Sequence, residues 1–190
     1  VIDASTGQNG LNQAKQFGAN CDGLGLFPIG PDRLVLCANH EYPAPVQMFP
    51  GWDSARRERA LGAFVAARPQ CVPYMQAAVG LTVVELERRR GVWRCKLDSR
   101  FNRRITAQTA IEIAGPARMH PLLNPSQDAR PLAFGTFGNC AAGTTPWGTY
   151  LTAEENVDDY FGNGSAASFE PAVAAAHRRV ARRLGVCREA

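Results

Sequence analysis

Glycine and proline recur along the whole chain, and they set the strongest limit on its fold. The 190 residues include 18 glycines and 13 prolines, which are spread out instead of forming one tract. Such frequent turn formers suit many short strands better than a bundle of long helices. With 45% hydrophobic and 20% charged residues, the chain is typical of globular proteins and long enough to bury a core. We therefore expect a mainly β fold.

Short hydrophobic runs between these turn formers predict where the strands lie. The clearest pattern is a hairpin whose loop contains Gly91, between residues 81–87 and 92–97. Repeated strands separated by turns indicate a propeller or a sandwich. The other expected strands are 24–29, 34–38, 106–113, 132–140 and 148–155. The expected helices are 53–66, 74–79 and 171–184.

The positive charge of the chain is scattered. The net charge is +4, and 19 of the 21 basic residues are arginines in short groups such as 88–90 and 178–179. Because no basic stripe is interleaved with aromatic residues, we expect no nucleic-acid partner, and small anionic substrates remain open. No apolar run reaches the length of a membrane span. The six cysteines include no CxxC pair, which excludes a zinc ribbon or a thioredoxin motif.

Polar side chains follow the expected strand 34–38. Asn39 and Glu41 share one face if extended geometry continues through His40, since strand side chains alternate. An amide oxygen beside a carboxylate is a pair of hard donors suited to calcium. The alternative is a hydrogen-bond network at the end of a strand, because buried polar groups need only partners.

A cysteine and two acids close two later strands. Cys140 lies among small residues that let the backbone approach another group closely, so a thiolate ligand would fit there. Glu154 and Glu155 are neighbours on a strand and should point to opposite faces. We expect at most one of them to face a given metal while the other supports the site from outside. Ordinary surface acids are the alternative.

A long motif joins these segments. Residues 139–156 read Asn-Cys-Ala-Ala-Gly-Thr-Thr-Pro-Trp-Gly-Thr-Tyr-Leu-Thr-Ala-Glu-Glu-Asn, and this segment closely resembles the signature of the PhoX-type alkaline phosphatases. The resemblance spans residues 13–162. Shorter stretches that also resemble this family are 13–22, 39–42, 48–51 and 102–106.

This resemblance implies a portion of a six-bladed β-propeller with a few inserted helices, exported to the periplasm or beyond. It implies a monomeric parent enzyme that hydrolyses phosphate monoesters with Fe3+ and Ca2+ at an axial site. Cys140 would be the thiolate shared by two irons, and Cys140 and Glu154 are the expected catalytic residues. The implied metal ligands are Asn39, Glu41, Cys140, Glu154 and Glu155.

The chain also departs from the family pattern. Ala142 stands where the signature usually has glycine, and its methyl group is expected to crowd the metal site. After Gly162 the sequence turns arginine-rich, so 171–190 is expected to be an atypical helical tail.

The family's phosphate-binding arginines are expected beyond Ala190, because Arg103 and Arg104 are better explained as residues that hold a loop. We therefore expect residues 1–190 to be an incomplete N-terminal part of one propeller phosphatase domain, with little activity of its own.

Two other functions fit the same residues. One is a calcium-binding propeller module without phosphatase activity. The other is a calcium-dependent lactonase on a similar propeller, which needs no thiolate, so Cys140→Ser would leave its activity nearly intact.

Overall fold

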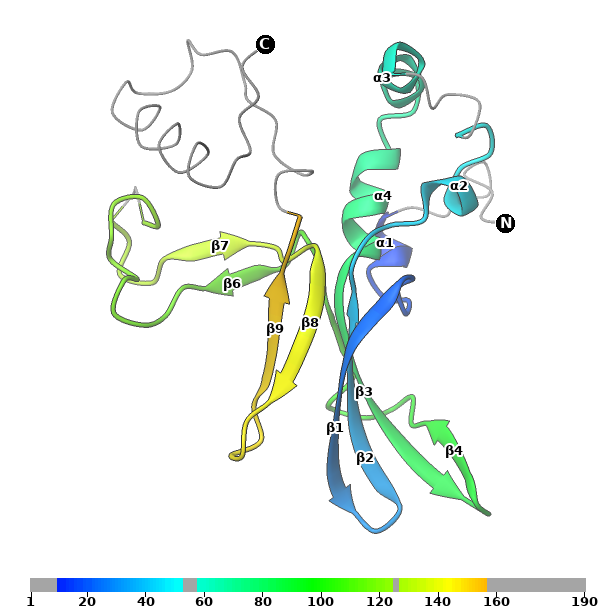
Figure 1. Ribbon diagram of the computed structural model, residues 1–190, viewed down its shortest axis with the longest axis vertical. Coiled ribbons are helices and arrows are strands. Elements are labelled where there is room, and N and C mark those ends of the chain that lie inside the picture. The colour runs from blue at the N-terminus through cyan, green and yellow to red at the C-terminus, as the bar shows by residue number, and fades with distance from the viewer. Residues whose placement is uncertain (1–9, 53–57, 125–126, 157–190) are drawn as a thin grey trace. The chain divides into compact units, whose positions relative to one another are not determined.

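Strands make up most of the regular structure in the computed structural model, which describes residues 10–52, 58–124 and 127–156 (Figure 1). One unit spans Val1–Glu155, and a second spans Asn156–Ala190. The helix predicted at 171–184 and the tail at 171–190 lie outside the described residues.

The strands are β1 (Cys21–Gly30), β2 (Arg33–His40), β3 (Gly80–Arg89), β4 (Val92–Cys95), β5 (Arg103–Ile105), β6 (Ala110–Glu112), β7 (Leu132–Phe134), β8 (Asn139–Thr144) and β9 (Tyr150–Glu154). The helices are α1 (Gly10–Gln13), α2 (Pro45–Met48), α3 (Glu58–Ala67) and α4 (Cys71–Ala78). None of the helices in this described part has the length and apolar character needed to cross a membrane.

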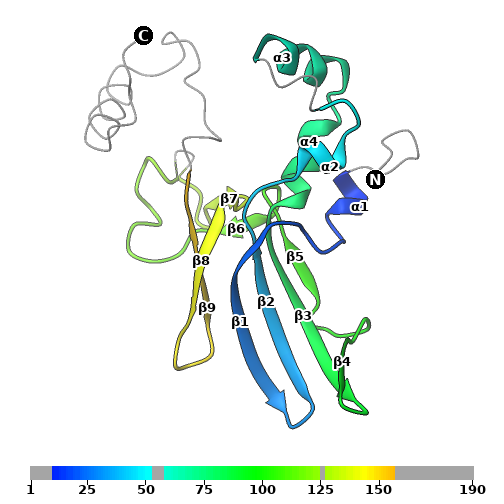
Figure 2. The same cartoon turned by 45° about the vertical axis from the view of Figure 1, so that its right-hand side comes forward.

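Three antiparallel sheets contain these strands. The largest has the order β1-β2-β3-β4, with β5 also paired to β3, and Figure 2 shows β1, β2 and β3 side by side. The others are the pairs β6-β7 and β8-β9. None of the sheets formed by the described residues closes on itself. The predicted mainly β class is therefore confirmed, and the propeller remains a prediction.

The central position of β2 explains its apolar residues on both faces. Leu36 pairs with Leu26 of β1 on one side and Val84 of β3 on the other. On one face of the sheet, a buried cluster is formed by Val35, Cys37, Leu81 and Val83, and Tyr150 of β9 packs against it. We call this the β9-side face. Residues at the alternate positions of β2 and β3 occupy the other face.

The helices gather near the end of the sheet where β2 finishes and β3 begins (Figure 2). A second cluster, around Phe49, Phe64 and Tyr74, joins α2, α3 and α4. The chain passes from α4 into β3 at Gly80, whose φ is +95°. A Cβ at this position would lie 2.1 Å from the Ile105 carbonyl oxygen, so only glycine lets β5 approach here.

The hairpin predicted around Gly91 is confirmed. Arg89 pairs with Val92, which leaves a loop of two residues. Arg90 and Gly91 both have positive φ, 52° and 78°, as in the mirror-image turns that suit the twist of a hairpin.

The strand predicted at 132–140 is wrong as a single element. It divides into β7 and the start of β8, because Gly135 and Gly138 both adopt positive φ and break the extended chain. The strand predicted at 106–113 is shorter in the structure, where only β6 forms.

Candidate metal centre

Three side chains that could ligate a metal converge at one end of the large sheet. A carboxylate oxygen of Asp22, a carboxylate oxygen of Glu41 and the Cys140 sulfur all lie within 4.8 Å of one another. Glu41 and Cys140 are half-buried, and Asp22 is exposed. We call these three residues the ligand group.

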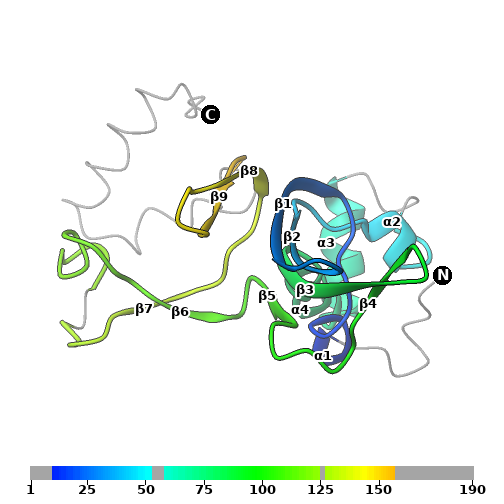
Figure 3. The ribbon, with the colours of Figure 1, turned by 90° about the horizontal axis from the view of Figure 1, so that it is seen from below.

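Strand topology explains why residues so far apart in the sequence meet. Cys21, at the start of β1, pairs with His40, at the end of β2, so Asp22 and Glu41 lie at the same end of the sheet. Strand β8 runs beside β1, as Figure 3 shows, and brings Cys140 to that end.

Two glycines permit these close approaches. A Cβ on Gly23 would lie 2.7 Å from the Cys140 carbonyl oxygen and 2.4 Å from the Ala142 methyl carbon. A Cβ on Gly138 would lie 2.4 Å from the Glu155 carbonyl oxygen. The methyl group of Ala142, which we expected to crowd the metal site, thus lies beside the bare backbone of Gly23.

A hydrogen bond joins two members of the ligand group. The Cys140 thiol donates a hydrogen bond to Asp22 Oδ2 over 2.7 Å. This bond, then burial and a hydrogen bond to Glu155, raises the pKa of Cys140 to about 12. Burial, followed by the charges of Glu155 and Asp22, raises the pKa of Glu41. A bound cation would replace the Cys140 proton, because a thiol binds a metal in its deprotonated form.

The structure separates the two neighbouring acids of β9. Glu155 interacts with Glu41 and with Cys140, so its side chain extends the ligand group. Glu154 instead accepts hydrogen bonds from the Thr136 hydroxyl at 2.9 Å and the Phe137 backbone N–H at 3.3 Å. Glu155 therefore lies on the side of Cys140, and Glu154 lies on the side of Thr136.

Asn39 lies outside the ligand group although it was predicted as a ligand. It is fully buried, and its Nδ2 donates to the carbonyl oxygens of Cys140 at 2.8 Å and Ala141 at 3.3 Å. Its Oδ1 accepts from the hydroxyls of Tyr150 at 2.9 Å and Thr152 at 3.1 Å. This is the strand-end hydrogen-bond network that the sequence left open as the alternative.

Sequence reasoning missed Asp22 and Tyr150. Asp22 belongs to the stretch 13–22, which had already been singled out for its resemblance, so its carboxylate could have been considered. Tyr150 likewise belongs to the motif 139–156, but its partners lie more than 100 residues away in the chain, so the motif did not reveal them.

The donor atoms of these residues suit Ca2+ and Fe3+, the metals that the family resemblance implies. Carboxylate oxygens are the ligands that calcium prefers, and a thiolate suits iron. Asp22, Glu41 and Glu155 could bind calcium, and Cys140 could bind iron.

Comparisons with known proteins show the family of the chain. The family model described as alkaline phosphatase PhoX matches residues 2–189. The chain belongs to the PhoX alkaline phosphatase family. A solved structure described as Pseudomonas fluorescens PhoX in complex with vanadate, a transition state analogue, is similar with 36% sequence identity and a TM-score of 0.71. The similarity covers 90% of this chain and 28% of that one. A search of curated proteins gave no match.

The opposite face of the large sheet carries a different set of polar residues. His40 is fully buried there, and its Nε2 lies 2.7 Å from the Thr82 hydroxyl. Arg104 donates to this hydroxyl and to the carbonyl oxygens of Ala77 and Val79. Arg104 therefore secures the end of α4, in agreement with the structural role expected from the sequence.

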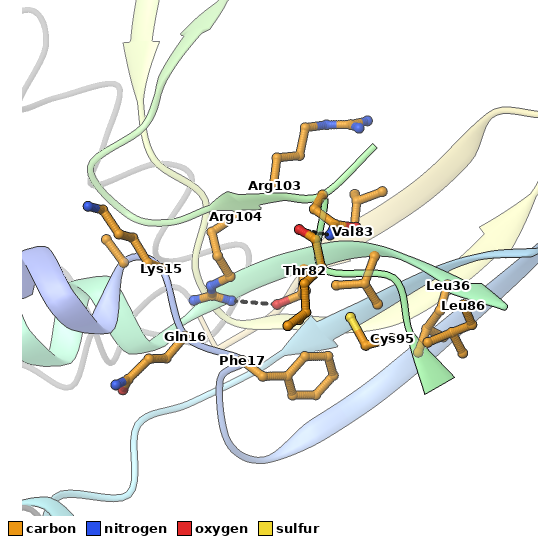
Figure 4. A pocket seen from close by; sticks show the side chains of 14 residues that line it. Lys15, Gln16, Phe17, Leu36, Thr82, Val83, Leu86, Cys95, Arg103 and Arg104 are labelled. Atoms are coloured by element: carbon orange, nitrogen blue, oxygen red, sulfur yellow. Dashed lines mark hydrogen bonds between the residues drawn. The ribbon is translucent and has the colours of Figure 1, made fainter. Parts of the chain in front are cut away.

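A hollow of about 630 Å³ lies on the same face. Figure 4 shows Arg104 beside Thr82, with Phe17, Leu36 and Cys95 farther along the hollow. Its lining is mostly apolar and includes Val83 of the buried cluster.

Proposed function

We propose that the protein hydrolyses phosphate monoesters at a metal centre formed by Asp22, Glu41, Cys140 and Glu155. The observation that carries this proposal is the convergence of a thiol and carboxylates from separate strands. Membership of an alkaline phosphatase family supports it. The vanadate complex of the similar structure supports it as well, since that title names vanadate as a transition state analogue.

We further propose that the metals are Ca2+ and Fe3+, and that this chain contributes part of a larger, exported six-bladed propeller. Thiolate and carboxylate ligands side by side favour this pair of metals. The chain spans 28% of the similar solved structure, so other parts of a full-length enzyme would complete the site. The predicted ligand roles of Asn39 and Glu154 remain predictions, and their hydrogen bonds favour supporting roles for both.

Bound metal ions would polarise phosphoryl oxygens and offset the negative charge of the substrate. The residues of this chain would bind those ions and give up protons to do so. Cys140 would lose its thiol proton on binding a metal, and Glu41, whose pKa is raised by burial and by the charges of Glu155 and Asp22, would bind as a carboxylate. Glu154 would keep Thr136 and Phe137 in place next to the site.

The test measures phosphate release from p-nitrophenyl phosphate together with metal content in a full-length enzyme that contains residues 1–190. We expect the chelator EDTA to abolish activity and Ca2+ with Fe3+ to restore it. Cys140→Ser should lower activity more than 100-fold, beyond the roughly 10–100-fold loss typical when a supporting residue is changed. Cys95→Ser is the matched control, because Cys95 is an exposed thiol of β4 outside the ligand group.

The outcomes separate the alternatives. Calcium binding without iron and without phosphate release would favour the calcium-binding module. Lactone hydrolysis that survives Cys140→Ser would favour the lactonase. If Cys140→Ser left the phosphatase activity unchanged, the proposed role of the thiol would be contradicted.

A further inference from the structure

The side-chain amide of Asn39 makes its hydrogen bonds to groups of the protein on both its nitrogen and its oxygen. An asparagine amide offers two N–H donors and two oxygen lone pairs. Both donors reach carbonyl oxygens at the start of β8, those of Cys140 and Ala141. Both lone pairs face hydroxyls of β9, those of Tyr150 and Thr152. The amide therefore fastens the end of β2 to both strands of the β8-β9 pair.

The Tyr150 hydroxyl extends this connection to β1. Its oxygen lies 3.0 Å from the Gly23 carbonyl oxygen and 2.9 Å from Asn39 Oδ1, so its single proton is shared between these two acceptors. Burial is the main reason that the pKa of Tyr150 is raised to about 12, so the phenol keeps its proton at neutral pH. Its ring packs against the buried cluster on the β9-side face, which holds the hydroxyl in place.

Three of the groups that Asn39 and Tyr150 link are close in sequence to a member of the ligand group. The Gly23 carbonyl follows Asp22, Asn39 precedes Glu41 by two residues, and the Cys140 carbonyl belongs to the ligand itself. Asn39 and Tyr150 thus link the three chain segments that carry the ligand group, which are the start of β1, the end of β2 and the start of β8. Residues that hydrogen-bond to metal ligands and orient them commonly affect metal affinity.

We propose that Asn39 and Tyr150 are positioning residues that hold Asp22, Glu41 and Cys140 at the separation required by shared metal ions. This inference rests on the proposed function. It assigns the two residues a role through the ligands and not through contact with metal or substrate.

The main test is Tyr150→Phe, which removes one oxygen atom and keeps the packing of the ring. Iron binding is followed by the thiolate-to-iron absorption band during titration with ferric citrate, and calcium binding by calorimetry. We expect both affinities to fall roughly 10–100-fold. Tyr74→Phe is the matched control, because Tyr74 is a buried tyrosine of the separate helical cluster, and its metal affinities should stay within about twofold of wild type.

Asn39→Asp distinguishes positioning from direct ligation. If Asn39 Oδ1 bound the metal, a carboxylate oxygen at the same place would preserve or strengthen cation binding. If Asn39 acts through Nδ2, the exchange removes both donors to β8, and the affinities should fall as they do for Tyr150→Phe. Preserved affinity in Asn39→Asp would overturn the positioning role of this residue.

Other outcomes separate the inference from the proposed function. A wild-type protein that binds neither iron nor calcium would contradict the proposed function itself. A wild-type protein that binds both, with Tyr150→Phe equal to Tyr74→Phe, would overturn this inference alone. Circular dichroism of the metal-free variants checks folding. Unfolding of both Tyr150→Phe and Asn39→Asp would also overturn it, because the pair would then serve the whole fold and not the site.

Discussion

The two faces of the large sheet use neighbouring residues of β2 for different purposes. Asn39 and His40 are both fully buried, yet strand geometry places them on opposite faces. Asn39 joins the strands that bear the ligand group. His40 instead receives the Gly18 N–H at Nε2 and lies in a T-shaped contact with the Phe17 ring.

On the face that carries His40, the polar side chains stabilise the fold. The Gly18 N–H donates to His40 Nε2, and the Thr82 hydroxyl, which accepts from Arg104, lies 2.7 Å from the same nitrogen. Burial, followed by the charge of Arg104, lowers the pKa of His40 to about 4. The comparison teaches that a buried polar residue at a strand end can serve either a site or the fold, and that its partners decide which.

The largest effect should come from Asp22→Asn, which breaks the ligand group on one face only. We expect metal affinity and phosphatase activity to fall more than 100-fold, since even supporting residues cost roughly 10–100-fold. Cys21→Ser changes the neighbouring residue, which contacts His40 on the other face. Its activity should stay within about twofold of wild type, and an equal loss in both variants would show that the two faces are not independent.

The second effect concerns stability in acid and tests the His40 face. The folded-state pKa of His40 lies below the ordinary value of 6.5, at about 4, so the neutral ring stabilises the fold above pH 6.5. That contribution is lost as the pH falls from 6.5 toward 4, by an amount on the order of 3 kcal/mol at 1.36 kcal/mol per pKa unit.

Urea unfolding at several pH values measures this loss. In His40→Gln, a variant without the titrating ring, the slope of stability against pH between 4 and 6.5 should decrease by the equivalent of one proton. The same slope in the variant and in wild type would mean that another group causes the acid sensitivity.

A third change, Gly23→Ala, probes the contact between β1 and β8. The new methyl group would lie 2.4 Å from the Ala142 methyl carbon, so we expect a destabilisation of about 1–3 kcal/mol and weaker metal binding. Adding Ala142→Gly removes the nearest of these contacts and should restore part of the stability in a double-mutant cycle. Strict additivity of the two changes would show that the residues do not touch.

The smallest effect is expected far from both polar networks. Arg88 and Asp32 form an exposed ion pair at the hairpin end of the sheet, and such pairs contribute at most about 1 kcal/mol. Arg88→Ala should therefore change the thermal midpoint only slightly and leave metal affinity unchanged. A loss of metal affinity in this variant would show that the ligand group depends on the whole sheet.

The sequence by itself determined the features that depend on neighbouring residues. The turn signals around Gly91 predicted the hairpin, and the apolar run 34–38 predicted a strand, which the structure places between β1 and β3. The motif around Cys140 was enough to recognise the family that the comparison then showed. These features are local because turn geometry and side-chain alternation follow from short stretches of chain.

Only the tertiary structure decided which side chains meet. The bond from Cys140 to Asp22 joins residues 118 positions apart, and the bond from Asn39 to Cys140 joins residues 101 positions apart. The choice of Glu155 over Glu154 as the neighbour of Cys140 likewise depends on how β9 is placed against β1 and β2. The physical reason is that the ligand group forms where the ends of separate strands come together. No local sequence pattern specifies how close such distant residues lie in space.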